Sequence, residues 1–195
     1  MTKVNNRGFT IIELLIATVV FSVILLIITG AIVQFGRIYY RGNVDSKTKE
    51  AARNIVNSIS QDIQFGASNS FTPATHTAGT IYTLSTSSHC YIYRLNQQVS
   101  TGNPGMMMTD GSSCPVPPAF SSTGQEMLGD KMQLADISVT DYDSSQNLVK
   151  VSVRVVYGDN EDFTDGTKKA CKPIRVGGQF CSVAEMSAIV AKRIR

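Results

Sequence analysis

The chain has 195 residues and a formal net charge of +3, and only 17% of its residues are charged, below the usual quarter. A net charge this small gives no reason to expect a specific nucleic-acid partner. The length suits one domain, or one domain with an extension. Much of the apolar content lies in residues 14–33, which contain no charged side chain. A helix of that length is about 30 Å long and matches a bilayer core, so one membrane span is predicted.

A short basic head precedes the apolar run and ends in glycine. Lys3 and Arg7 are its charged side chains, and a single carboxylate, Glu13, lies just inside the apolar run. An acid at the edge of a membrane span costs about 2–3 kcal/mol unless it finds a partner. We therefore expect Glu13 to have a function.

A cleaved secretory signal peptide and an uncleaved signal anchor are two simpler explanations of this segment. A signal peptide has an apolar core of about 7–15 residues before a small-residue cleavage site, whereas this run is longer and no such site follows. A signal anchor explains the length but gives no role to Glu13. Arg37 and Arg41 follow the span closely, so positive charge alone does not set its orientation.

The helical pattern continues beyond the span. Apolar or small residues recur at spacings of three and four on one helix face, namely Val44, Thr48, Ala51, Ala52, Ile55, Ile59 and Ile63. We expect one helix over about residues 10–65, roughly 80 Å long and ended by Gly66. Its second half is amphipathic and must pack on another layer. Gly30, Gly36 and Gly42 predict a bend or local melting.

The pattern then changes to short apolar alternations. Residues 67–79 are rich in Ser, Thr and Ala and predict a linker or loop. Two strands are expected over residues 80–85 and 90–95, with a tight turn at Ser87 and Ser88. A long proline-containing loop is expected over residues 102–124. Met106, Met107 and Met108 within it should fill the underside of the loop or, less simply, form an adaptable contact surface.

The clearest strands are residues 132–142 and 148–157, joined by a hairpin loop. In the second of them four valines, at positions 149, 151, 153 and 155, share one face, which should pack on the isoleucine stripe of the helix. Residues 158–178 predict another loop. Residues 182–195 fit a helix or a strand; we favour a strand at the sheet edge, where Lys192 and Arg193 would discourage further pairing.

These elements predict an α+β fold, in which a long N-terminal membrane-spanning helix packs on a small antiparallel β-sheet domain. The expected division is a polar leader (1–8), a membrane-spanning half of the helix (9–35), an amphipathic half (36–65) and a globular β domain with disulfides (66–195).

Four cysteines, Cys90, Cys114, Cys171 and Cys181, lie beyond the span. None forms a CxxC pair, and neither histidine has metal-ligand spacing to them, so zinc is disfavoured. Two disulfides in an oxidising compartment are the better interpretation, with free buried thiols as the alternative. Three pairings are possible, and we favour sequence neighbours because each pair flanks a Gly/Pro-rich loop. Because disulfides persist outside the cytoplasm, the cysteine-bearing part is expected there and the N-terminus in the cytoplasm.

No catalytic motif stands out in the sequence, and no enzyme activity or cofactor is expected. One acidic loop contains Asp159, Asp162 and Asp165, whose oxygens would suit calcium in a flexible loop. The spacing does not match an EF-hand, and a solvated loop is the simpler interpretation.

Cleavage after Gly8 would create an amino group on Phe9, four residues from Glu13. Positions i and i+4 face each other on a helix, so the two charges could neutralise each other within one chain. The more productive arrangement joins Glu13 of an incoming subunit to the Phe9 amine of its neighbour, which would set the axial register of the two helices.

The sequence GFTIIELLIA, residues 8–17, resembles the processing and methylation motif of type IV prepilins and pseudopilins. The resemblance implies a pilin-like fold, cleavage between Gly8 and Phe9 by prepilin peptidase, N-methylation of Phe9, and Glu13 as the assembly carboxylate. Residues 51–66 are similar to J-type minor pseudopilins and W-type minor pilins.

The resemblance also implies a structural minor subunit of a type IV pilus or of a type II secretion-like filament. Its partners would be prepilin peptidase, other pilin or pseudopilin subunits, the inner-membrane assembly platform and, before assembly, membrane lipid. It would cross the inner membrane once and reach the cell surface in the filament. The alternative is a bitopic membrane-anchored binding protein or enzyme with an uncleaved signal anchor.

Overall fold

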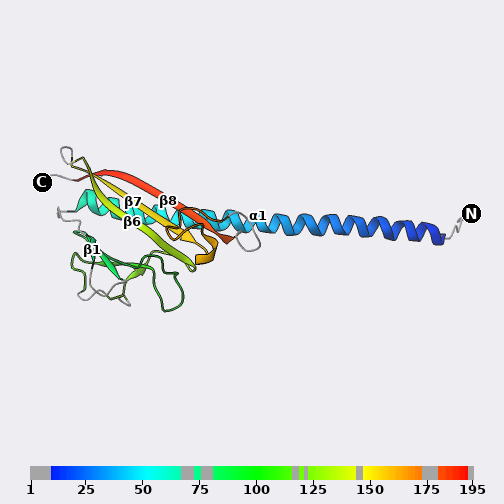
Figure 1. Ribbon diagram of the computed structural model, residues 1–195, viewed down its shortest axis with the longest axis horizontal. Helices are drawn as coiled ribbons and strands as arrows, with labels where there is room; N and C mark the ends of the chain where they lie inside the picture. The colour runs from blue at the N-terminus through cyan, green and yellow to red at the C-terminus, as the bar shows by residue number, and fades with distance from the viewer. Residues whose placement is uncertain are drawn as a thin grey trace, which may run out of the picture. The chain divides into compact units, whose positions relative to one another are not determined.

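The computed structural model describes residues 10–66, 73–75, 81–115, 119–120, 123–143, 147–172 and 180–192. The chain divides into two compact units, Met1–Tyr40 and Arg41–Arg195. Helix α1 (Ile11–Phe65) contributes to both (Figure 1). Its bounds confirm the predicted helix to within one residue at each end.

The helix is α-helical at Gly30, Gly36 and Gly42, so the expected local melting is not found. Each glycine costs only about 1 kcal/mol relative to alanine, which is too little to interrupt a helix that continues for several turns on both sides. A side chain at any of the three would meet nothing within 4 Å, so no close packing requires glycine there.

The described strands of the second unit form two antiparallel sheets. The first sheet has the order β1-β2-β3-β4-β5, each strand pairing with the next along the chain. Its strands are β1 (Pro73–Thr75), β2 (Tyr82–Ser85), β3 (His89–Tyr93), β4 (Met106–Asp110) and β5 (Gln125–Glu126). The second sheet has the order β6-β7-β8. Its strands are β6 (Met132–Asp143), β7 (Leu148–Tyr157) and β8 (Ser182–Ala191), and a 3-10 turn, η1 (Asn160–Asp162), follows β7.

Two strands lie within segments that were expected to be loops, and a third begins just after one. Strand β1 falls within the predicted linker, and β4 and β5 fall within or just after the predicted loop over residues 102–124. Met106 and Met107 are buried, and their strand pairs with β3 through the register Met107↔Ile92. The expectation that the methionines fill the underside of a loop was therefore wrong, because they belong to a central strand.

The second sheet confirms the predicted pairing. Strands β6 and β7 are antiparallel, and β8 continues the sheet as an edge strand. The expected loop over residues 143–147 lies mostly outside the described residues, and so does Arg193. The strand that we favoured for the C-terminal segment is confirmed.

The core forms where helix and sheets meet. The valines of β7 at positions 149, 151, 153 and 155 are at most 1% exposed and belong to one cluster with Ile55, Ile59 and Ile63 of α1. Figure 1 shows β6, β7 and β8 running along the cyan stretch of the helix. Burying four valines and three isoleucines contributes about 1.5–3 kcal/mol for each side chain. The predicted contact of the valine face with the isoleucine stripe is confirmed.

Candidate functional site

The N-terminal helix begins with a reciprocal pair of hydrogen bonds. The backbone N–H of Thr10 donates to Glu13 Oε2 over 2.9 Å, and the Thr10 hydroxyl donates to the same oxygen over 2.8 Å. In return, the Glu13 N–H lies 3.4 Å from Thr10 Oγ1. Thr10 is thus the N-cap and Glu13 the third helical residue of a capping box. A carboxylate also suits this end of a helix because of the helix dipole.

This geometry changes the interpretation of Glu13. The sequence suggested a carboxylate without a partner until a neighbouring chain arrives, but Thr10 of its own chain already binds it. The T-x-x-E spacing of positions 10 and 13 is the signal that could have predicted this. Gly8 and Phe9, the expected cleavage and methylation positions, lie outside the described residues.

The helix that follows has an apolar surface on all sides. Leu26 and Phe35 are among its large side chains that are more than two-thirds exposed. By length and composition, α1 is apolar enough to cross a membrane. Side chains of this kind require lipid, or neighbouring helices of the same kind, around them.

Two disulfides lie in the second unit. Cys90 in β3 is bonded to Cys114 beyond the end of β4, and Cys171 is bonded to Cys181 just before β8. These are the two pairs of sequence neighbours. They close loops whose ends are 24 and 10 residues apart. No free cysteine is found among the described residues.

The three aspartates of the acidic loop accept hydrogen bonds from other groups of the protein. Asp159 Oδ1 accepts from Gln98 Nε2 over 3.2 Å, and Asp162 Oδ2 accepts from the Asp159 N–H over 3.1 Å. Asp165 accepts from the Thr167 hydroxyl, which holds the pKa of Asp165 below its usual range. Within the described part of the chain, no three His, Cys, Asp or Glu side chains are grouped as metal ligands would be. Calcium binding by this loop stays a prediction.

A buried acid near the end of α1 was missed from the sequence. Asp62 is 7% exposed and accepts hydrogen bonds from His89 Nδ1 over 2.9 Å and from the Tyr91 hydroxyl over 2.7 Å. The Thr86 hydroxyl lies 3.0 Å from its Oδ2. Burial and the bond to Asp62 raise the pKa of Tyr91, which therefore stays a donor. The signal was present, since position 62 is three residues from Ile59 and lies on the buried face of the helix.

A buried lysine joins the loop after β7 to strand β6 through hydrogen bonds. Lys168 Nζ donates to the side-chain oxygen of Gln133, and Gln133 Nε2 donates in turn to the Gly158 carbonyl over 2.8 Å. The ammonium also lies 5.6 Å from the centre of the Phe163 ring. Burial lowers the pKa of Lys168. No pattern in the sequence predicted a role for this residue.

The features described so far are those of a pilin-like α+β chain: an apolar helix with a capped start, whose second half packs on antiparallel sheets. Residues 3–29 match the family model of the prokaryotic N-terminal methylation motif. This match supports a relationship to type IV pilins and pseudopilins. It fits a pilin-like precursor that can be anchored in a membrane. No curated protein and no solved structure matches the chain.

Proposed function

We propose that this chain is the precursor of a minor pilin or pseudopilin, a structural subunit of a type IV pilus or of a type II secretion-like filament. The observation that carries the proposal is the match of residues 3–29 to the N-terminal methylation motif. The Glu13 carboxylate at the start of an exposed apolar helix supports it, because such a helix needs neighbours of its own kind or lipid.

In this proposal prepilin peptidase cuts between Gly8 and Phe9, and Phe9 is N-methylated. The helix stays in the inner membrane, with its N-terminus in the cytoplasm, until the assembly platform adds the subunit to other pilins or pseudopilins. The disulfide-bonded unit lies outside the cytoplasm, where disulfides persist. The role is structural rather than catalytic. Resemblance to J-type pseudopilins and W-type pilins favours a minor subunit.

Intact-mass and N-terminal peptide analysis of membrane-extracted protein tests the processing step. We expect the loss of residues 1–8 and one added methyl group on Phe9. Protein from cells that lack the peptidase is the control and should keep Met1. An intact Met1 in cells that contain the peptidase would contradict the proposal and favour an uncleaved membrane anchor.

Substitution of Glu13 tests the assembly step. Glu13→Val removes both the charge and the cap, whereas Glu13→Gln removes the charge but keeps an oxygen that can accept from Thr10. We expect both variants to be processed and inserted in the membrane but to be depleted from filaments. Normal incorporation of Glu13→Val would show that Glu13 does not set the register between subunits.

A further inference from the structure

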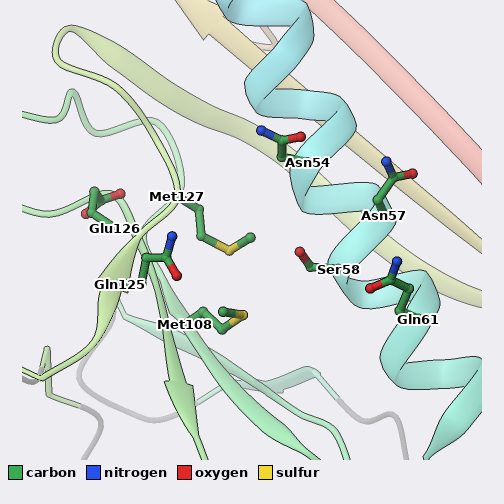
Figure 2. Close-up of a pocket in the computed structure, with 8 residues that line it drawn as sticks. All are labelled: Asn54, Asn57, Ser58, Gln61, Met108, Gln125, Glu126 and Met127. Atoms are coloured by element: carbon green, nitrogen blue, oxygen red, sulfur yellow. The ribbon is translucent and has the colours of Figure 1, made fainter.

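A polar cavity of about 430 Å³ lies between helix α1 and the edge of the five-stranded sheet (Figure 2). All of its lining residues belong to the unit Arg41–Arg195. It is separate from the N-terminal motif, and nothing in the proposed filament role uses it.

The helix wall of the cavity is a stripe of uncharged hydrogen-bonding groups. Asn54, Asn57, Ser58 and Gln61 follow the i, i+3, i+4, i+7 spacing that places residues on one face of a helix. Over seven residues the stripe is about 10 Å long. These side chains make no hydrogen bond to another described residue. A carboxamide offers both a donor and an acceptor, as a peptide group does.

The sheet wall adds one more carboxamide and two methionines. Figure 2 shows Gln125, Met108 and Met127 directed toward the helix. Glu126 brings a carboxylate to the lining, but that group accepts backbone N–H groups from Gly105, Met106 and Leu128 over 3.1, 3.0 and 3.1 Å. The Glu126 carboxylate is thus hydrogen-bonded to three backbone N–H groups, and no other described lining residue of the cavity is charged.

Strand β5 lies beside this cavity at the end of the sheet. Among the described strands it pairs with β4 alone, so no described strand covers its other backbone edge. The Met127 N–H donates to the Met106 carbonyl over 2.8 Å, and the next pair in the register is Met107↔Glu126. Hydrogen-bonded and non-hydrogen-bonded pairs alternate in an antiparallel ladder. The peptide N–H and C=O of Glu126 therefore point away from β4, where they could hydrogen-bond to an added strand.

We propose that this cavity binds an extended, uncharged peptide segment of a partner protein. A stripe of 10 Å spans about three residues of extended chain at 3.3 Å each. The carboxamides would hydrogen-bond to its backbone, the β5 edge could add it as a further strand, and Met108 and Met127 would receive an aliphatic side chain. With no unpaired charge and no aromatic ring in the described lining, a phosphate, a metal ion or a stacked sugar would lack its usual partners.

The test uses the full chain in detergent micelles and an array of N-acetylated, C-amidated peptides about ten residues long. In these peptides Ser, Thr, Asn or Gln alternate with Val, Ile or Leu. Binders are measured in solution by fluorescence anisotropy. We expect saturable binding to the wild type. Ser58→Trp, which fills the cavity, should weaken the affinity about tenfold or more, and the double variant Asn57→Ala, Gln125→Ala should also weaken it. Gln64→Ala, an exposed amide of α1 outside the cavity, is the matched control and should bind as the wild type does.

A second comparison tests backbone recognition. The best peptide is synthesised again with alternate backbone amides N-methylated, which removes donors without changing side chains, and should bind about tenfold more weakly. Equal binding of the methylated peptide would overturn the proposal, as would the absence of any array binder or binding unchanged in both cavity variants. Saturable binding of maltoheptaose in place of peptide would assign the cavity to saccharide instead. Matching thermal unfolding midpoints establish that the variants are folded.

Discussion

The buried carboxylate of Asp62 should be among the most sensitive positions of the second unit. His89 Nδ1 and the Tyr91 hydroxyl each donate to it at 2.9 and 2.7 Å. The single Thr86 hydroxyl hydrogen is shared with the His89 carbonyl, 2.7 Å away, so it counts for less. Asp62→Asn keeps one acceptor oxygen and turns an amide donor toward the remaining donors. Because a hydrogen bond to a charged group contributes about 1.5–3 kcal/mol, we expect a loss of about 2–3 kcal/mol in unfolding free energy.

Asp62→Ala should cost more, about 3–5 kcal/mol, because the donors of His89 and Tyr91 are then left without an acceptor. Urea unfolding of the full chain in detergent, with disulfides intact, measures both values. Far-UV circular dichroism reports the helix, and tyrosine fluorescence reports mainly the second unit, which holds five of the seven tyrosines. A ranking of wild type, Asp62→Asn and Asp62→Ala in falling stability is the expected result.

Asp110→Asn is the matched control for this prediction. Asp110 lies 3.6 Å from the other ring nitrogen of His89, but its side chain is fully exposed. An exposed pair of this kind contributes little, so we expect a change below about 1 kcal/mol. An unfolding free energy for Asp62→Asn within about 0.5 kcal/mol of the wild type would refute the claim that the hydrogen bonds to the buried Asp62 carboxylate stabilise the second unit.

Two further predictions concern covalent and pH-dependent stability. In the chain-entropy model, replacing both cysteines of Cys90–Cys114 by serine should cost about 3.5 kcal/mol, and those of Cys171–Cys181 about 2.7 kcal/mol; equal losses in urea unfolding would contradict the dependence on loop length. Burial raises the pKa of Tyr93 to about 12, against 10.0 in an unfolded chain. The unfolded state loses this proton first, so stability should fall as pH rises from about 10 to 12, and less steeply in Tyr93→Phe. Thermal unfolding midpoints across that range would show it, and identical slopes would count against it.

The sequence predicted best where one periodicity extended over many residues. The stripe that ends in Ile59 and Ile63 repeats over several helical turns, and the alternating valines of β7 mark a strand with one buried face. Both patterns report burial, because a helix or strand with one apolar face must cover it. Their contact followed from the need of each to bury that face.

Strand β4 could not be predicted in this way. Its sequence, Met106 to Asp110, has no β-branched residue except Thr109, and methionine favours helices over strands. Prolines on both sides also suggested a loop. The strand forms because β3 offers an unpaired edge and the methionines can fill the core beneath it. Both causes depend on tertiary contacts, which the local sequence does not report. Strand β1 is only three residues long and likewise depends on its neighbour, β2.

Lys168 and Gln133 show a second limit of the sequence. Their bond joins residues 35 positions apart in the chain, and neither lies in a pattern that marks it as buried. A lysine in a loop is usually exposed, so burial could not be predicted from residue type. Only the path of the loop after β7 brings the ammonium beneath the surface.

The capping box at the start of α1 leads to a last prediction about assembly. Both Thr10 donors use the same oxygen, Glu13 Oε2, and no described residue donates to Oε1. One carboxylate could therefore keep its cap and still accept a neighbour's amino group. Thr10→Val should loosen the first helical turn by about 1 kcal/mol, seen as faster amide exchange there, yet leave incorporation into filaments unchanged. Filament yield reduced as far as in Glu13→Val would instead mean that assembly depends on the cap itself rather than on the open oxygen.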